Sequence, residues 1–384
     1  MTRLPDGRYV DDEAFDPQAS LLELERKDLD APNWLLVWRK FKTHKLGLIS
    51  GLFLLIAYLM IPFAGFLAPY GPNQRFSEHL YSPPQSIKLF HEGEFVGPFV
   101  YPMTSEANLE TFQWEFSPDT SRPLKLEFFC EGKTYKLAGL IESNRHLFCA
   151  TEEATIFILG SDRLGRDIFS RVSYGAQLSL TVGLIGISVS FVLGIFFGSL
   201  AGYFGGKTDW LINRVIEVLR SLPELPLWLA LSAAVPSNWS PVAVFFVISI
   251  ILGILDWPGL ARSVRAKFLS LREEEYVRAA EMMGASSGRV IRKHLLPNFM
   301  SHLIASATLS IPAMILGETA LSFLGLGLRA PAVSWGVMLN DAQNLASIEI
   351  YPWTAIPMLP IVIVVLAFNF LGDGLRDSLD PYQQ

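Results

Sequence analysis

The strongest constraint on this chain is a series of long segments without a charged residue. Residues 46–69, 177–201 and 225–255 contain no Asp, Glu, Lys or Arg. A helix that crosses the hydrocarbon core of a bilayer needs about twenty apolar residues, because each residue adds about 1.5 Å and every backbone group must be bonded within the helix. The sequence therefore predicts an all-α polytopic membrane protein that lies in a lipid bilayer.

The longest of these segments is expected to hold two crossings. Residues 236–241 read PSNWSP and interrupt it with residues at which helices stop. The first crossing begins near Leu211 and carries three charged residues at spacings of three, which we place at the membrane interface. Residues 299–328 and 350–371 are also apolar over a sufficient length. The chain is therefore expected to have six transmembrane helices.

The basic residues predict which loops face the cytoplasm. Residues 261–298 hold eight Lys and Arg against four Glu, and such an excess in a short loop marks the cytoplasmic side. An even number of crossings then places both termini in the cytoplasm. The expected order is a cytoplasmic segment (1–45), a first transmembrane helix (46–69), an outside insert (70–174), a core of five helices (175–373) and a cytoplasmic tail (374–384).

The outside insert is long enough to fold. Residues 124–130 and 134–140 have the character of two strands, and Glu131-Gly132-Lys133 would join them as a hairpin. The only two cysteines, Cys130 and Cys149, lie in this insert, on the side where disulfides form. A disulfide between them and a pair of buried thiols both remain open, because the sequence does not give the distance between their Cα atoms.

The cytoplasmic stretch contains the signals of two short helices. Residues 270–273 have the form of a capping box, so a helix should start there and run to about Met283, before Gly284. A second helix should run from Ser286 or Ser287 to His294 and stop at Pro297. Two amphipathic helices between membrane spans form a rigid unit that a partner protein can push, although a solvated loop is the simpler alternative.

This stretch also carries a resemblance. Residues 275–298 read EYVRAAEMMGASSGRVIRKHLLPN and resemble the EAA loop of permease subunits of bacterial ABC importers. Arg278 stands where that loop usually has Glu, and His294 where it usually has Ile. Both departures are familiar in the oligopeptide and dipeptide branch. The second, C-type permease of that branch is also similar in GSDRLGRDIFSRVSYGA (160–176), AGYFGG (201–206), ETALSFLGLG (318–327), SWG (334–336) and FNFLGDGLRDSLDP (368–381).

The resemblance implies a type I ABC importer permease with six helices in the bacterial inner membrane. Its partners would be a second homologous permease subunit, two ATP-binding subunits or one fused subunit, and a periplasmic solute-binding protein. Transport would follow alternating access, with di- or oligopeptides as the substrate. Related permeases carry oligosaccharides, opines or nickel, and these substrates stay open. A non-transporting membrane scaffold or sensor is the alternative from another class.

The resemblance also assigns a role to the loop 274–298, which we call the coupling loop. Arginines in it would dock on the ATP-binding subunit, and small residues would let helices approach closely. The residues expected to couple the two subunits are Arg278, Ala279, Ala280, Gly284, Ala285, Arg289, Arg292, His294, Leu296 and Pro297. Residues 73–159 and the first forty residues lie outside the resemblance.

We find no catalytic constellation, metal-ligand motif or nucleic-acid-binding pattern in the sequence, so no catalytic residue and no metal site are expected. Residues 201–208 approach a phosphate-binding loop, but Ala201 replaces its first Gly and the preceding segment is a membrane helix. No cofactor is expected on this chain, and ATP and Mg²⁺ would bind the partner subunits. Glu318 and Asn369, polar residues inside apolar spans, either line a translocation path or have a structural role.

Overall fold

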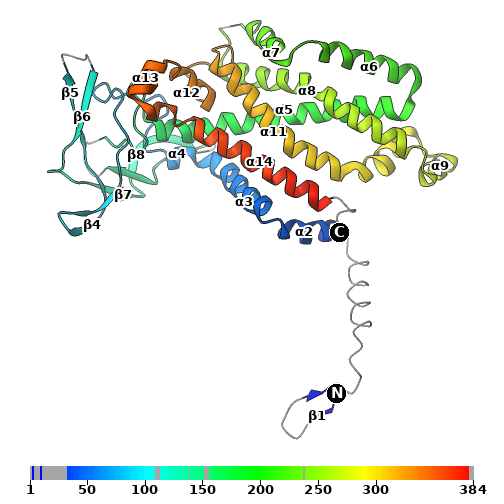
Figure 1. Cartoon of the computed structure of the whole chain (residues 1–384), viewed down its shortest axis with the longest axis horizontal. Helices are drawn as coiled ribbons and strands as arrows, with labels where there is room; N and C mark the ends of the chain where they lie inside the picture. The colour runs from blue at the N-terminus through cyan, green and yellow to red at the C-terminus, as the bar shows by residue number, and fades with distance from the viewer. Residues whose placement is uncertain are drawn as a thin grey trace.

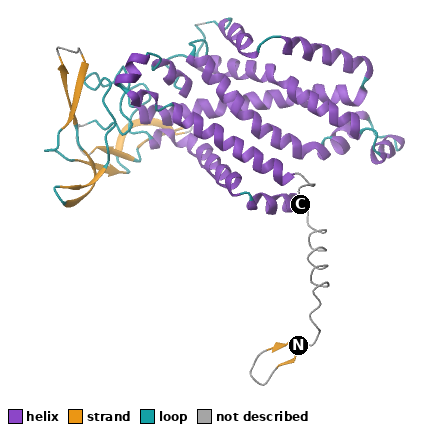
Figure 2. Cartoon of the chain, viewed as in Figure 1, coloured by secondary structure: helices purple, strands orange, loops and turns teal. Residues whose placement is uncertain are grey.

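In the computed structural model, the described residues are 2–3, 9–10, 33–108, 113–137, 139–150, 155–236 and 238–379. Helices form one elongated body and strands gather at one end of it (Figure 1; Figure 2). The helices are α2 (Asn33–Thr43), α3 (Lys45–Met60), α4 (Ala64–Leu67), α5 (Ile168–Phe204), α6 (Gly206–Ser221), α7 (Glu224–Ala233), α8 (Pro241–Leu271), α9 (Glu275–Met282), α10 (Ser287–Val290), α11 (Met300–Phe323), α12 (Trp335–Asp341), α13 (Leu345–Ile350) and α14 (Met358–Leu379).

Five helical segments of the described chain are long and apolar enough to cross a membrane. They are Lys45–Leu67, Ile168–Phe204, Pro241–Leu271, Ser287–Phe323 and Pro352–Leu379. The shortest has 23 residues, which at about 1.5 Å per residue exceeds the thickness of the hydrocarbon core. These five segments confirm five of the six expected spans.

The remaining expected span, from Leu211 to about residue 235, is not one continuous helix. The chain forms α6 and α7 instead, with Leu222 in an extended conformation between them. Pro223 explains the break, because a proline ring disfavours helical geometry in the residue before it. The ten residues of α7 reach only about half of the hydrocarbon core. Figure 1 shows α6 and α7 following one another along α8.

Small residues allow the long helices to pack closely. A Cβ atom built at Gly198 of α5 would lie 2.6 Å from the carbonyl oxygen of Ala261 in α8. One built at Gly253 of α8 would lie 2.5 Å from the carbonyl oxygen of Gly186 in α5. Glycine at both positions therefore brings the two backbones together along most of their length, as small residues do in membrane bundles. On the other side of the body, α14 packs against α3 and α11.

The two ends of the helical body differ. The strands lie at one end, and α9 and α10 lie at the opposite end (Figure 1). Helix α2 packs against the last turns of α14, away from the strands (Figure 1). Residues 1, 4–8, 11–32 and 380–384, which hold most of the expected cytoplasmic segment and half of the expected tail, lie outside the described residues.

The insert contains a four-stranded antiparallel sheet and two hairpins. The sheet has the order β10-β7-β4-β3, with Phe99 opposite Lys125 and Cys149 opposite Glu127. The hairpins are β5–β6 and β8–β9, and β1 pairs with β2 near the start of the chain. The strands are β1 (Thr2–Arg3), β2 (Tyr9–Val10), β3 (Lys88–His91), β4 (Glu94–Val100), β5 (Met103–Asn108), β6 (Gln113–Pro118), β7 (Leu124–Phe128), β8 (Glu131–Leu137), β9 (Ile141–Arg145) and β10 (Phe148–Ala150).

The expected hairpin between residues 124–130 and 134–140 is wrong. Strand β7 pairs with β4 and β10, whereas β8 pairs with β9. The alternation of side chains explains the choice, because Leu124 and Leu126 both enter a buried cluster with Val100 of β4 and Phe148 of β10. Ala138, within the second expected strand, lies outside the described residues. In the structure Cys130 and Cys149 form a disulfide, with their Cα atoms 6.1 Å apart.

Candidate functional site

The first helix of the coupling loop begins later than the capping box predicted. The expected helix start at Ser270 is wrong, because α8 continues through Leu271 and α9 begins at Glu275 with Glu274 as its N-cap. The side chain of Glu273, the last residue of the expected capping box, forms ion pairs with Arg272 and Arg278 instead. The hydrogen bond from Arg278 lowers the pKa of Glu273 below its usual range.

A glycine turn joins the two helices of the loop. Gly284 has φ +82°, a left-handed conformation that residues with a Cβ rarely adopt. Ser286 follows as the N-cap of α10. After α10 the chain continues as a π-helical turn (Ile291–Leu295) and a 3₁₀ turn (Pro297–Phe299) into α11. Both expected helices are therefore present. Helical turns run from Ser287 to Leu295, and Pro297 begins the next turn, because a helix tolerates proline in its first turn.

One face of the coupling loop is buried against the membrane helices. Val277 and Val290 are fully buried in a cluster with Val264 and Phe268 of α8. The same cluster includes Leu303 of α11. The loop and the adjoining ends of α8 and α11 therefore share one close-packed core.

The tip of the loop exposes two methionines that the sequence reasoning did not select. Met282 is 84% exposed and Met283 is 82% exposed, directly before the Gly284 turn. Apolar side chains at a protruding tip are typical of a contact surface, and methionine adapts its shape to the surface it meets. The signal in the sequence was the pair of large apolar residues on the polar side of an amphipathic helix.

The structure distributes the expected coupling residues over both faces of the loop. Ala280 is buried, as close packing requires, whereas Ala279 faces outward. Ala285, His294 and Leu296 are half-buried, and the exposed residues are Arg278, Ala279, Gly284, Arg289, Arg292 and Pro297. The outward face therefore combines three arginines with the methionine tip.

Polar contacts tie the coupling loop to the end of α5. The Tyr203 hydroxyl donates a hydrogen bond of 2.6 Å to Glu281 of α9. The Arg272 guanidinium donates to the carbonyl oxygens of Gly202 and Tyr203, at 3.4 and 3.3 Å. The loop therefore contacts three long helices, α5, α8 and α11.

Glu318 lies inside the protein in this structure. It is fully buried in α11, where Oε1 accepts hydrogen bonds from Ser322 (2.7 Å) and from Ser334 (2.8 Å), the N-cap of α12. Its Oε2 has no partner among the described residues. Glu318 therefore connects α11 to α12, while Asn369 is half-buried on a different helix, α14.

A buried ion network occupies the other end of the body, near the insert. Arg171 at the start of α5 pairs with Asp162, and its Nη2 lies 3.1 Å from Asp341 at the end of α12. Arg166 lies 2.7 Å from both carboxylates. Burial raises the pKa of Asp341, but the charges of Arg171 and Arg166 more than offset it, so the pKa lies below its usual range. Sequence reasoning missed this network, because Asp341 lies about 170 residues after the arginines that it pairs with.

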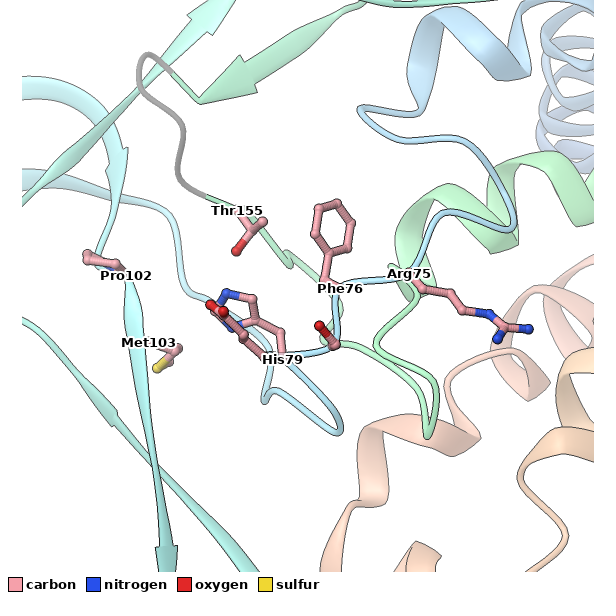
Figure 3. A pocket seen from close by; sticks show the side chains of 8 residues that line it. Arg75, Phe76, His79, Pro102, Met103 and Thr155 are labelled. Atoms are coloured by element: carbon pink, nitrogen blue, oxygen red, sulfur yellow. The ribbon is translucent and has the colours of Figure 1, made fainter.

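A polar pocket of about 370 Å³ lies where the insert meets the helical body. It is lined by the segment 75–79 and by Pro102, Met103 and Thr155 (Figure 3). Figure 3 shows the His79 ring on the side facing Met103, while Arg75 points away toward the helices. Burial lowers the pKa of His79 below its usual range, although the charge of Glu78 acts in the opposite direction.

Two further sequence features have plain structural explanations. Residues 201–208, the near match to a phosphate-binding loop, form the end of α5, a turn at Gly205 and the start of α6. Such a loop needs a strand before it, and here a helix occupies that place. Among the residues that the structure describes, no three His, Cys, Asp or Glu side chains are grouped so as to hold a metal ion.

Comparisons with known proteins agree with this architecture. Residues 194–383 match the family described as binding-protein-dependent transport system inner membrane component, and residues 33–84 match the N-terminal transmembrane domain of oligopeptide transport permease C. The chain is 43% identical over 224 residues to the dipeptide transport system permease protein DppC of Bacillus subtilis, an alignment covering 58% of this chain and 68% of that protein.

The oligopeptide transport system permease protein OppC of Haemophilus influenzae is 41% identical over 223 residues, which cover 58% of this chain and 69% of that protein. Among solved structures, an inward-facing form of the MetNI methionine ABC transporter overlaps with a TM-score of 0.43 at 19% identity, over 55% of this chain and 96% of that chain. By its sequence relatives, the chain belongs to the family of binding-protein-dependent transport system inner membrane components.

Proposed function

We propose that this chain is one of two permease subunits of an ATP-driven importer and forms half of the translocation path for di- or oligopeptides. The observation that carries the proposal is the coupling loop, which is packed rigidly on α8 and α11 and exposes an apolar tip at the end opposite the insert. The names of the relatives, which are dipeptide and oligopeptide permeases, support peptides as the substrate.

In this proposal the methionine tip and the outward arginines dock on an ATP-binding subunit. Closure of two ATP-binding subunits, or of one fused subunit, would displace the loop. The buried cluster around Val277 and Val290 would pass that displacement to α8 and α11, and the close α5–α8 packing would make α5 follow. The helices would then rotate as rigid bodies and open the path alternately to the two sides. ATP and Mg²⁺ would be held by the partner subunits alone.

The same proposal fixes the orientation. The coupling loop, α2 and the end of α14 would face the cytoplasm, with both termini on that side, and the insert would face the periplasm. The basic excess of residues 261–298 supports this orientation. Helices α6 and α7 would together complete the sixth passage as a broken helix. The insert would meet the solute-binding protein, and the disulfide suits an oxidising compartment.

The test is transport by the whole complex in liposomes, with partner permease, ATP-binding subunits and solute-binding protein loaded from a peptide mixture. We expect loaded binding protein to stimulate ATP hydrolysis and peptide uptake. Gly284→Asp should abolish both effects while the complex still assembles, because the turn needs a left-handed residue. Gly288→Asp is the matched control, since Gly288 is exposed on the same loop in a helical conformation.

The other outcomes of this experiment would indicate a different substrate or function, or would contradict the proposed role of the coupling loop. A complex that assembles but ignores peptides would redirect the search to oligosaccharides, opines or nickel. A chain that copurifies with no ATP-binding subunit would favour a scaffold or sensor. Uptake by Gly284→Asp equal to that of the unmodified complex would contradict the role given to the coupling loop.

A further inference from the structure

An apolar groove runs between α2, α3 and α14, away from the coupling loop and the insert. Its volume is about 720 Å³. Every residue that lines it is apolar, namely Val37, Trp38 and Phe41 of α2, Leu48, Gly51, Leu52 and Leu55 of α3, and Leu371 and Leu375 of α14. Gly51 contributes to the depth of the groove, because a Cβ there would lie 3.2 Å from Leu371.

The groove is open on the side that faces the bilayer. Leu52 and Leu55 are each 57% exposed, although they belong to a membrane-spanning segment. The segment Lys45–Leu67, which begins with α3, is the least covered of the five long segments, with only 17% of its apolar window buried. A surface of this composition at membrane depth is covered by hydrocarbon chains.

Basic side chains border the groove where α2 meets α3. The last turn of α2 carries Lys40 and Lys42, and Lys45 begins α3. Lys42 and Lys45 are exposed, and the Lys42 ammonium lies 5.4 Å from the centre of the Trp38 ring, which itself lines the groove. An apolar helix face with an aromatic residue and a basic border is the pattern of a helix lying at the membrane surface.

Among the described residues near this border, acidic side chains are fewer than basic ones. Asp377 lies 3.9 Å from His44, and Asp373 is exposed one turn earlier on α14, where Arg376 stands between them. The described residues of the border therefore carry an excess of positive charge directly beside an apolar groove. That combination matches a molecule with an anionic head and a hydrocarbon chain.

We propose that the groove binds an anionic phospholipid, with one acyl chain along Leu48, Leu52 and Leu55 and the phosphate at Lys42 and Lys45. The charge of the border favours an anionic headgroup over a zwitterionic one, because a juxtamembrane Lys adds about 1 kcal/mol of attraction to anionic lipid. The site is separate from the coupling loop, so the inference does not depend on the transport function proposed above.

The test measures lipid binding to the full-length chain purified in detergent. Phosphatidylglycerol and phosphatidylcholine with identical acyl chains are titrated, and retained lipid is counted by native mass spectrometry. We expect one phosphatidylglycerol molecule to bind more tightly than the others and more tightly than phosphatidylcholine. Lys42→Gln with Lys45→Gln should reduce that preference by about fivefold for each lysine removed.

Two other variants separate the groove from general attraction to charge. Lys207→Gln with Lys267→Gln removes two exposed lysines from α6 and α8, and should leave the preference intact. Leu52→Trp should fill the groove and displace both lipids while the protein remains folded. The proposal would be overturned if the protein retained the two lipids equally, or if both lysine pairs lowered the preference for phosphatidylglycerol by the same factor. Unchanged lipid binding in Leu52→Trp would also overturn it. The last result would indicate that another protein segment fills the groove.

Discussion

The two ends of the helical body are held together by different forces. At the coupling loop, apolar side chains from α8, α9, α10 and α11 pack into one buried cluster. At the end near the insert, charged side chains connect α5 to α12, and the Glu318 carboxyl group connects α11 to α12. Apolar packing is non-directional, whereas hydrogen bonds between charged groups require a fixed geometry.

This difference suggests a division of roles. A displacement applied at the coupling loop can be transmitted through a packed interface whose side chains shift together. The opposite end contains partners that lose much of their interaction energy if they separate, so α12 should stay fixed relative to α5 and α11. We therefore expect the ion network to determine stability and the coupling loop to determine how ATP hydrolysis is linked to uptake.

The largest effect should come from breaking the ion network. Arg171→Met keeps the length of the side chain but removes one of the two buried arginines that pair with Asp162 and Asp341, and leaves only Arg166. The Arg171 side chain is only 2% exposed. Removing one member of a buried ion pair costs about 3–5 kcal/mol. The variant should lose that much free energy of unfolding, measured by denaturant titration of the purified chain.

Arg163→Met is the matched control, because Arg163 pairs with the same Asp341 but its side chain is 54% exposed. An exposed pair contributes about 0–1 kcal/mol. Equal losses in the two variants would show that burial of the network does not matter, and the proposed contrast between the two ends would fail.

A smaller, local effect is expected from the disulfide. Cys130 and Cys149 are 19 residues apart, and a crosslink that closes a loop of this length stabilises by about 3 kcal/mol. Cys130→Ser with Cys149→Ser should make the insert sensitive to limited proteolysis, while fragments containing α5 to α14 persist. Treatment of the unmodified chain with a reducing agent should give the same fragments. Simultaneous cleavage throughout the chain would instead mean that the insert and the helices unfold together.

The sequence predicted the helical core better than the insert, for a physical reason. Long uncharged segments have few structures available in a membrane, so five of the spans followed directly. The break at Leu222 and Pro223 was missed because the prediction used apolar composition alone. Proline disfavours helical geometry in the residue before it, and this effect ends α6. In the insert, the expected hairpin paired two strands because they are neighbours in the sequence. Strand β7 pairs with β4 and β10 instead, because its leucines enter the buried cluster that these strands share.

The candidate site was predictable only where its signals were local. The coupling loop followed from capping residues, from glycine and from the part of the family resemblance that residues 275–298 carry, although its first helix starts five residues later than expected. Contacts between distant segments left no such signal. Arg171 and Asp341, or Glu318 and Ser334, meet only after α12 folds back between α5 and α11.

At the coupling loop, a buried and an exposed residue should separate stability from coupling. Val290→Ala removes two buried methyl groups from the cluster and should cost about 2 kcal/mol of unfolding free energy. Met283→Ala truncates an exposed side chain and should change stability by less than about 0.5 kcal/mol, yet reduce peptide-stimulated ATP hydrolysis in the assembled complex. Normal stimulation in Met283→Ala would remove the methionine tip from the proposed contact.

The smallest effect concerns two glycines four residues apart in the same loop. Gly284 has φ +82°, so a Cβ there should cost about 1 kcal/mol, whereas Gly288 lies in α10 with open space around it. Gly288→Ala should therefore be neutral or stabilise by up to about 1 kcal/mol, because alanine has the higher helix propensity. Gly284→Ala should therefore lower the thermal unfolding temperature, whereas Gly288→Ala should leave it unchanged or raise it. Shifts in the same direction would mean that the left-handed turn at Gly284 can rearrange, and a turn that rearranges could not transmit a displacement between α9 and α10.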